Sequence, residues 1–341
     1  MTIEGHTDLA YSDDVEARFY GYNWNTLHNW NTLHVNNVNN ANKLEAAINK
    51  AKSFTDKPTL IVVKSIIGWG APNKQDTASA HGEALGEDEV KAAKKFYGWP
   101  EDKQFYVPDG VMQQFADGFG TRGKKLHAEW VERFKTYEKS NPALAKEARE
   151  MLETKLPEGL GKRDPDFRGG REGSRHARFV GQGAQRARAT HCIAWLIGDA
   201  ADLSPSTRTN LKFDGAGSFE ADDYAGRNLH FGIREHGMGS VANGLALSDM
   251  RAYASRFLIL SDYMKPPIRL SVIMEVSVIY VFTHDSIGVG EDGPTHQPIE
   301  QLAALRAVPG LTLLRSAEMP TKSAKRGASR CRTTRSRRAS C

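Results

Sequence analysis

V-F-T-H-D-S-I-G-V-G-E-D-G-P-T-H-Q-P-I-E, Val281–Glu300, is the stretch that decides the fold of this chain. It begins inside V-S-V-I-Y-V-F, Val276–Phe282, a short apolar, β-branched run that predicts a buried parallel strand. This apolar run ends abruptly after Phe282. In an open α/β sheet, ligands bind in the loop after a strand's carboxyl end. The sequence therefore predicts an α/β fold with a site in this loop.

The loop carries side chains that suit a binding site. His284 and His296 offer hydrogen-bond donors or acceptors near physiological pH, and Asp292 offers a fixed acceptor. Its glycines let the backbone turn sharply and approach a ligand closely. The alternative is a solvated glycine-rich loop. Because the polar groups converge where the sheet places sites, we interpret the loop as a site.

Composition sets the broad class of the protein. Its 341 residues could hold two domains, and the hydrophobic content of 40% suits a globular protein. No apolar run approaches the roughly 20 residues that span a membrane. The polar start, Thr2–Asp14, does not resemble a secretory signal, and the three cysteines have no disulfide or metal spacing. These features predict a cytoplasmic protein without a membrane partner.

Basic charge gathers in two segments that lack a helical or strand period, Leu160–Cys192 and Ser316–Cys341. Residues 160–190 and 317–341 hold sixteen basic and four acidic residues, and without them 30 basic residues face 37 acidic ones. We expect both segments to be unpacked, because they can bury little apolar surface. Arginine-rich tails bind phosphate backbones, but this one has no interleaved aromatics and follows an acidic body. A nucleic-acid partner is therefore not expected.

The remaining periodicity predicts further elements. Thr59–Ile67 has the pattern of a buried strand, and Asp13 is placed to cap the first helix. A second helix should begin at Asn141-Pro142. The predicted helices cover Val15–Tyr20, Lys43–Ser53, Glu87–Tyr97 and most of Lys124–Lys155.

The loop motif T-H-D-S-I-G-V-G-E-D-G-P-T-H-Q-P resembles the pyrimidine-binding domain of transketolase, the thiamine-diphosphate enzyme of the pentose phosphate pathway. Most of Ile3–Asn141 and Trp195–Arg315 resembles that family, whereas the two basic segments do not. The resemblance implies the thiamine-diphosphate-binding fold, with parallel sheets flanked by helices and parts of two domains. The implied divisions are the C-terminal part of the diphosphate-binding domain at 1–140, a partly aberrant linker at 141–192, an incomplete pyrimidine-binding domain at 193–315 and a disordered basic tail at 316–341.

G-I-R-E-H, Gly232–His236, resembles the family's signature for its catalytic glutamate, which implies that Glu235 binds the aminopyrimidine ring nitrogen of the cofactor. From the residues alone, Glu235 stands near the start of a helix rich in small residues, and such a helix can pack closely in a dry environment. The alternative is a surface salt bridge between Glu235 and Arg234.

F-L-I-L-S-D-Y, Phe257–Tyr263, resembles the family's F-x-x-F-x-x-Y pyrimidine pocket. The resemblance implies that Phe257, Leu260 and Tyr263 bind the cofactor. Leu260 replaces the second aromatic residue, so this contact loses ring stacking of about 0.5–1.5 kcal/mol. By spacing alone, these residues could simply be core.

Two more segments follow strand-like runs, W-L-I-G-D-A-A-D-L-S-P-S at Trp195–Ser206 and the loop that contains His81. The resemblance implies that Asp202 and His81 lie at the cofactor and that Ser206 contacts the substrate phosphate. It also implies that His81 reaches the substrate and joins Glu235 as a catalytic residue. The residues alone leave open a turn at Asp202, a helix cap at Ser206 and a loop histidine of no assigned purpose.

The implied reaction moves a two-carbon ketol unit from a ketose phosphate to an aldose phosphate. His284 and His296 would contact substrate oxygens, His296 also as a catalytic residue, and Asp292 would read a hydroxyl group. The family implies a homodimer and Mg²⁺ or Ca²⁺, whose ligands we do not find in this chain, so we expect a truncated chain that could be inactive alone. The alternative is a non-catalytic remnant or interaction protein that binds thiamine diphosphate only in part.

Overall fold

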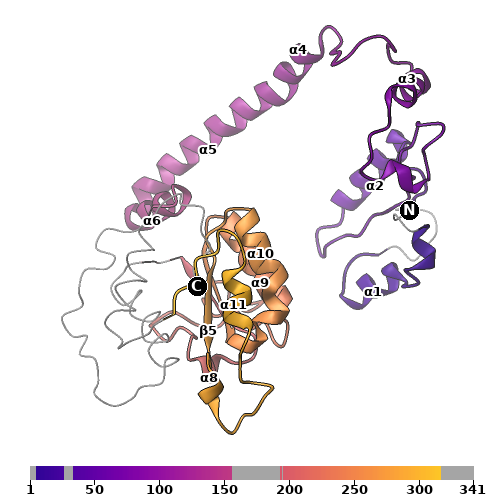
Figure 1. Cartoon of the computed structure of the whole chain (residues 1–341). Helices are drawn as coiled ribbons and strands as arrows, with labels where there is room; N and C mark the ends of the chain where they lie inside the picture. Colours follow the sequence, from indigo (N-terminus) through magenta and orange to yellow (C-terminus); the bar gives the residue numbers. More distant parts are fainter. Residues whose placement is uncertain (1–4, 27–33, 156–192, 194, 316–341) are drawn as a thin grey trace. The chain divides into compact units, whose positions relative to one another are not determined.

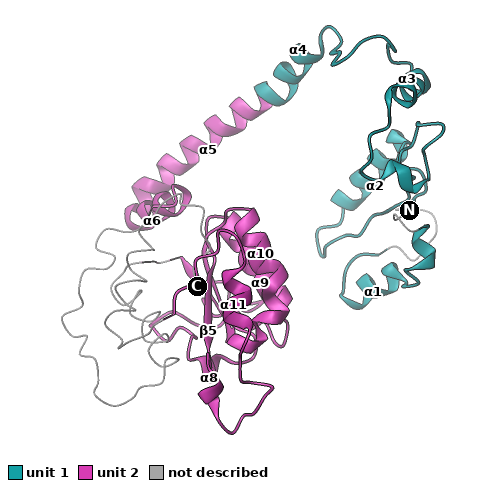
Figure 2. Ribbon diagram, in the orientation of Figure 1, with its two compact units in different colours: residues 1–121 teal, residues 122–341 magenta. Residues whose placement is uncertain are grey.

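The computed structural model describes residues 5–26, 34–155, 193 and 195–315, and the chain divides into two compact units, 1–121 and 122–341 (Figure 2). The two basic segments that we expected to be unpacked lie outside the described residues. The four-part division at residues 140, 192 and 315 stays a prediction.

The first unit holds a small parallel sheet in which His34 pairs with Val62 and Val35 with Val63. The predicted strand at Thr59–Ile67 is wrong in length, because among the described residues only Val62 and Val63 form a strand, with an isolated bridge from Thr59 to Asn25. Ile66 is 43% exposed, so the predicted burial also fails there. The elements of this unit are η1 (Thr7–Leu9), α1 (Val15–Gly21), β1 (His34–Val35), α2 (Ala41–Lys52), β2 (Val62–Val63), η2 (Ala78–Ala80), α3 (Glu87–Phe96), α4 (Val111–Phe115) and η3 (Ala116–Gly120).

The cap of α1 also differs from the prediction. Asp14 is the N-cap, and its side chain accepts a hydrogen bond from the backbone nitrogen of Ala17 at 2.9 Å. Asp13 instead pairs with Arg18 on the helix surface. An N-cap side chain must reach the free amides of the first turn, and here Asp14 is the residue that does so.

The second unit begins with the helices α5 (Thr121–Ser140) and α6 (Pro142–Leu152), which confirms the predicted start at Asn141-Pro142. Proline suits the first helical position because its missing amide hydrogen has no partner there. The two helices are joined by Arg149, whose guanidinium donates two hydrogen bonds to Glu138 at 2.7 and 2.9 Å. The same group lies over the ring of Phe134.

A three-stranded parallel sheet in the order β3-β4-β5 forms the centre of this unit, with strands β3 (Leu196–Ala200), β4 (Arg251–Phe257) and β5 (Ile279–Thr283). Asp199 pairs with Ala254 in register, and Phe257 pairs with Thr283. The parallel strand predicted before the histidine loop is confirmed, three residues later than expected at its start.

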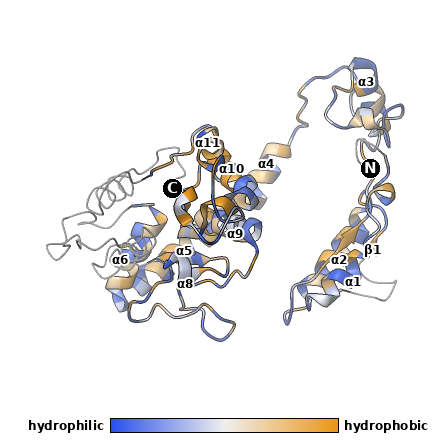
Figure 3. Cartoon of the chain, turned by 60° about the horizontal axis from the view of Figure 1, so that its bottom comes forward, coloured by the Kyte–Doolittle hydropathy of each residue, from blue (hydrophilic) through white to orange (hydrophobic). Residues whose placement is uncertain are grey.

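The helices α9 (Glu235–Leu247), α10 (Lys265–Ile273) and α11 (Gln301–Arg306) lie together on one side of this sheet (Figure 1). A Cβ atom at Gly239 would lie 2.7 Å from a ring carbon of Pro267, so the small residues of α9 permit its close packing on α10. The buried core here includes Met238, Ala254 and Leu305, and Figure 3 shows hydrophobic residues concentrated in these helices.

The opposite face of the sheet packs on a second cluster, which includes Trp195, Leu211 and Tyr253. The shorter elements of this unit are α8 (Ser204–Thr207), η4 (Leu258–Met264) and η5 (Ile287–Val289). Among the described residues, we find no helix with the length and apolar character needed to cross a membrane.

Candidate functional site

The carboxyl edge of the three-stranded sheet gathers most of the predicted site residues of the second unit. Asp202 and Ser206 follow β3, Phe257 ends β4, and His284 follows β5. Because neighbouring parallel strands end at one edge, the topology brings these segments together. Asp202 is exposed in a left-handed conformation with φ 58°, and Ser206 is exposed as the third residue of α8. The cap considered for Ser206 is wrong, because Leu203 precedes that helix.

Glu235 is the first residue of α9 and is 7% exposed, which confirms the predicted dry helix start. Its partner is not Arg234, and a surface salt bridge is therefore the wrong interpretation. The carboxyl oxygen Oε1 contacts Nη2 of Arg256 on β4. Arg234 instead donates a hydrogen bond to the carbonyl oxygen of Phe231 at 3.0 Å. The buried pair fixes the start of α9 against the end of the sheet.

Phe257 is covered by two predicted substrate residues. The ring centroid of His284 lies 3.8 Å from that of Phe257 and the ring of His296 lies at 5.6 Å. Nδ1 of His284 is 3.0 Å from the hydroxyl of Thr283, and Nδ1 of His296 is 2.9 Å from that of Thr295. The structure therefore joins the histidine loop to the predicted pyrimidine pocket.

The other residues of the predicted pocket and loop are more open to solvent. Leu260 is half-buried in η4, whereas Tyr263 is 64% exposed at the end of that element. Asp292 is exposed in the loop between β5 and α11. A loop contact also comes from Arg315, whose Nε donates to Asp285 at 2.9 Å. Of the three residues predicted to bind the pyrimidine, Phe257 is therefore buried, Leu260 half-buried and Tyr263 exposed.

Asp199 is a buried acid that the sequence reasoning did not single out. Its Oδ1 accepts a hydrogen bond from the backbone nitrogen of Ala200 at 2.8 Å, while its buried Oδ2 has no hydrogen-bond partner among the described residues. Burial raises the pKa of Asp199 to about 6, against smaller lowering effects of the Ala200 amide and His230. Burial also raises the pKa of the neighbouring Tyr253, with a smaller contribution from the charge of Asp199. This part of the sheet therefore holds a buried acid whose burial is offset only in part.

His81 belongs to the first unit, where it follows η2 and is exposed. The loop before it is anchored by Glu89 of α3. Oε1 of Glu89 accepts hydrogen bonds from the backbone nitrogens of Asn73 and Lys74 at 2.8 and 3.2 Å, and Oε2 accepts from the Asn73 side chain at 2.9 Å. The Asn73 side chain is the main cause of a lowered pKa at Glu89.

We expect Glu89→Gln to loosen this loop, because a neutral amide replaces a carboxylate that accepts three hydrogen bonds. Amide hydrogen exchange should show lower protection at Asn73 and Lys74. The depressed pKa means that the carboxylate stabilises the fold above its unfolded pKa and loses this effect as the pH falls through its folded pKa. Glu87→Gln, on the exposed start of α3, is the matched control. Unchanged protection in both variants would contradict the anchoring role.

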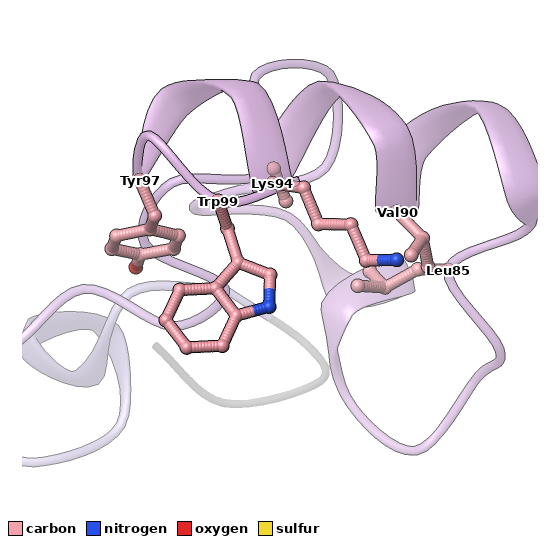
Figure 4. A pocket seen from close by; sticks show the side chains of 6 residues that line it. Leu85, Val90, Lys94, Tyr97 and Trp99 are labelled. Atoms are coloured by element: carbon pink, nitrogen blue, oxygen red, sulfur yellow. The ribbon is translucent and has the colours of Figure 1, made fainter. Parts of the chain in front are cut away.

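A groove of about 470 Å³ lies elsewhere in the first unit (Figure 4). Its charged group is Lys94, whose Nζ donates a hydrogen bond to the carbonyl oxygen of Lys103. None of the predicted site residues lines it. Its walls are Leu85, Val90, Ala93, Lys94, Tyr97 and Trp99.

Sequence reasoning missed two charged residues on neighbouring strands, Arg256 and Asp199. Each interrupts a run that is otherwise apolar or small, A-Y-A-S-R-F in one case and W-L-I-G-D-A in the other. A charged residue inside a buried strand is costly unless it is paired. That conflict between residue type and expected burial was the signal available in the sequence.

Two family models together match all the described residues of this chain. Residues 1–157 match the thiamine diphosphate binding domain of transketolase, and residues 151–324 match the pyrimidine binding domain of transketolase. The Bacillus subtilis transketolase is 40% identical over 319 residues, which cover 93% of this chain and 46% of that protein. A chloroplastic transketolase of Craterostigma plantagineum is 41% identical, with 93% and 60% covered.

Solved structures agree with these matches. A Pichia stipitis transketolase in complex with sedoheptulose 7-phosphate superposes with a TM-score of 0.85 at 32% identity, covering 99% of this chain and 49% of that one. The Leishmania mexicana transketolase gives 0.86 at 29% identity, with the same coverage. The chain thus spans about half the length of these relatives.

Proposed function

Because the chain belongs to the transketolase family, we propose that it takes part in moving a two-carbon ketol unit from a ketose phosphate to an aldose phosphate. The observation that carries this proposal is the buried carboxyl of Glu235 at the start of α9. This carboxyl pairs with Arg256, the residue before Phe257 in the sequence. We further propose that the protein acts in the cytoplasm, in the pentose phosphate pathway, as a homodimer.

The residues of the second unit fit the pyrimidine side of thiamine diphosphate in type. Glu235 offers a buried carboxyl, Phe257 a buried ring, and Leu260 and Tyr263 further apolar surface in the same segment. A divalent metal is not matched in the same way. Among the residues that the structure describes, no group of three or more His, Cys, Asp or Glu side chains could hold a metal ion.

When bound, thiamine diphosphate supplies the carbanion chemistry that cleaves the ketose between C2 and C3. Glu235 would exchange a hydrogen bond and a proton with the aminopyrimidine ring nitrogen, and its burial excludes water from that bond. The Phe257, Leu260 and Tyr263 side chains would hold the ring, and Asp202 would lie at its edge.

The substrate would lie against the exposed side of the same pocket. His284 and His296 would bind its oxygens, and His296 would also move a proton, since imidazole transfers protons best near ambient pH. Asp292 would accept a hydrogen bond from a hydroxyl group, and Ser206 would donate one to the phosphate. We also propose that His81 of the first unit takes part as a catalytic residue.

The test is a titration calorimetry experiment with thiamine diphosphate and Mg²⁺ on the full chain, followed by an assay of ketol transfer. We expect saturable binding and measurable transfer, and a loss of transfer of about 10²–10⁴-fold in Glu235→Gln, because the variant keeps the shape but not the proton chemistry. His236→Gln, an exposed neighbour on α9, is the matched control. No binding at millimolar cofactor, or full transfer in Glu235→Gln, would overturn the proposal.

Two contacts favour a second candidate, a non-catalytic protein that binds thiamine diphosphate only in part. Arg256 holds the carboxyl oxygen that the reaction would use, and His284 covers the Phe257 ring. Cofactor binding without any ketol transfer in the same two experiments would support this candidate over the enzyme.

A further inference from the structure

Arg256 makes a buried contact that the proposed chemistry does not use. Its Nη2 contacts Oε1 of Glu235, and its Nη1 donates to the carbonyl oxygen of Ala201, just after β3. The two charged side chains are 7% and 9% exposed. The guanidinium therefore links the start of α9 to the carboxyl edge of the sheet through the residue that the cofactor would need.

This contact is strong compared with what a pyrimidine ring can offer. Both partners are charged, and hydrogen bonds between charged groups are roughly twice as strong as neutral ones. The pair lies away from solvent, so water screens its attraction little. A neutral ring nitrogen that approaches Oε1 competes with this charged donor for the same oxygen.

The guanidinium of Arg256 also has no second acid with which to pair among the described residues. Its Nε is buried without a hydrogen-bond partner, and among the described residues Glu235 is the one acid that pairs with Arg256. Displacement would leave a buried cation without its counter-charge, which is costly. The cost of moving Arg256 is then subtracted from the affinity of any ligand that binds Glu235.

We propose that Arg256 is a built-in competitor for Glu235, and that it weakens binding of the thiamine pyrimidine by occupying the carboxyl oxygen in the cofactor-free chain. The inference rests on the proposed function, since it takes the pyrimidine as the ligand of Glu235. The effect of a competitor on thiamine affinity is opposite in sign to that of a residue that positions Glu235 for binding. A positioning arginine would strengthen binding, whereas a competitor weakens it.

The test is calorimetric titration of thiamine, which lacks the diphosphate, into the wild type and two variants of the full chain. Arg256→Gln removes the positive charge but keeps hydrogen-bonding groups, and we expect it to bind thiamine at least about ten-fold more tightly. Arg256→Lys keeps the charge, and its affinity should stay within about three-fold of the wild type. Equal or weaker binding by Arg256→Gln, or no binding by any of the three proteins at millimolar thiamine, would overturn the inference.

A measurement on the wild type covers the case in which Arg256→Gln does not fold. In protein with ¹³C-labelled arginine, the Arg256 side-chain resonance, assigned through its absence in Arg256→Lys, should shift as thiamine saturates the site. An unmoved resonance at saturation would also overturn the inference. The proposed function is judged separately, by cofactor binding and ketol transfer in the wild type, so the two failures are distinguishable.

Discussion

Glu235→Ala is expected to lower the free energy of unfolding by about 3–5 kcal/mol, because it leaves the buried guanidinium of Arg256 without its counter-charge. Equilibrium unfolding in urea, followed by circular dichroism, measures the loss. The carboxyl group therefore matters to the fold as well as to the proposed chemistry. Glu235→Gln also removes the counter-charge, but its amide oxygen can still accept a hydrogen bond from Arg256 and its side chain keeps the volume of glutamate, so it is the variant that tests activity.

The double variant Glu235→Ala with Arg256→Met separates the ion pair from other effects. Once both charges are gone, no unpaired charge remains, so the double variant should be more stable than Glu235→Ala alone. The coupling in this cycle should be about 1–3 kcal/mol. Additive losses from the two single changes, or a loss below about 1 kcal/mol in Glu235→Ala, would contradict the buried ion pair.

Asp199→Asn is expected to raise the free energy of unfolding by about 3 kcal/mol at pH 7. The pKa of Asp199 rises from 3.8 to about 6 on folding, and each unit corresponds to about 1.4 kcal/mol. At pH 7 the wild type must bury a charged carboxylate whose Oδ2 has no hydrogen-bond partner. Asparagine removes that charge and keeps an oxygen for the Ala200 amide.

The sign of the pH dependence follows from the raised pKa. Between about pH 4 and 6 the folded chain holds a proton on Asp199 that the unfolded chain has released, so this group makes stability fall as the pH rises through that window. Urea unfolding at several pH values should show the difference between wild type and variant shrinking toward pH 4. Asp214→Asn, an exposed acid of the same unit, is the control. A variant that is less stable than the wild type at pH 7 would refute the argument.

The sequence by itself determined the parallel strand before the histidine loop, the paired helices that meet at Asn141-Pro142, and the buried start of α9. Each of these depends on local signals. A β-branched run, a proline after a cap position and a row of small residues act through the backbone and close neighbours, and they need no distant partner. The family also follows from motifs that are contiguous in the chain.

Tertiary structure alone decided which groups meet. Arg256 lies 21 positions after Glu235 in the sequence. Only the packing of α9 against β4 brings the guanidinium to that carboxyl. The tilted ring contact between His284 and Phe257 likewise depends on the register of β5 against β4. The short β2 strand has the same origin, because a strand exists only where a neighbour supplies hydrogen bonds, and β1 supplies them for just two residues. Charge pairing, ring contacts and strand length are properties of neighbours in space, and a linear pattern does not contain them.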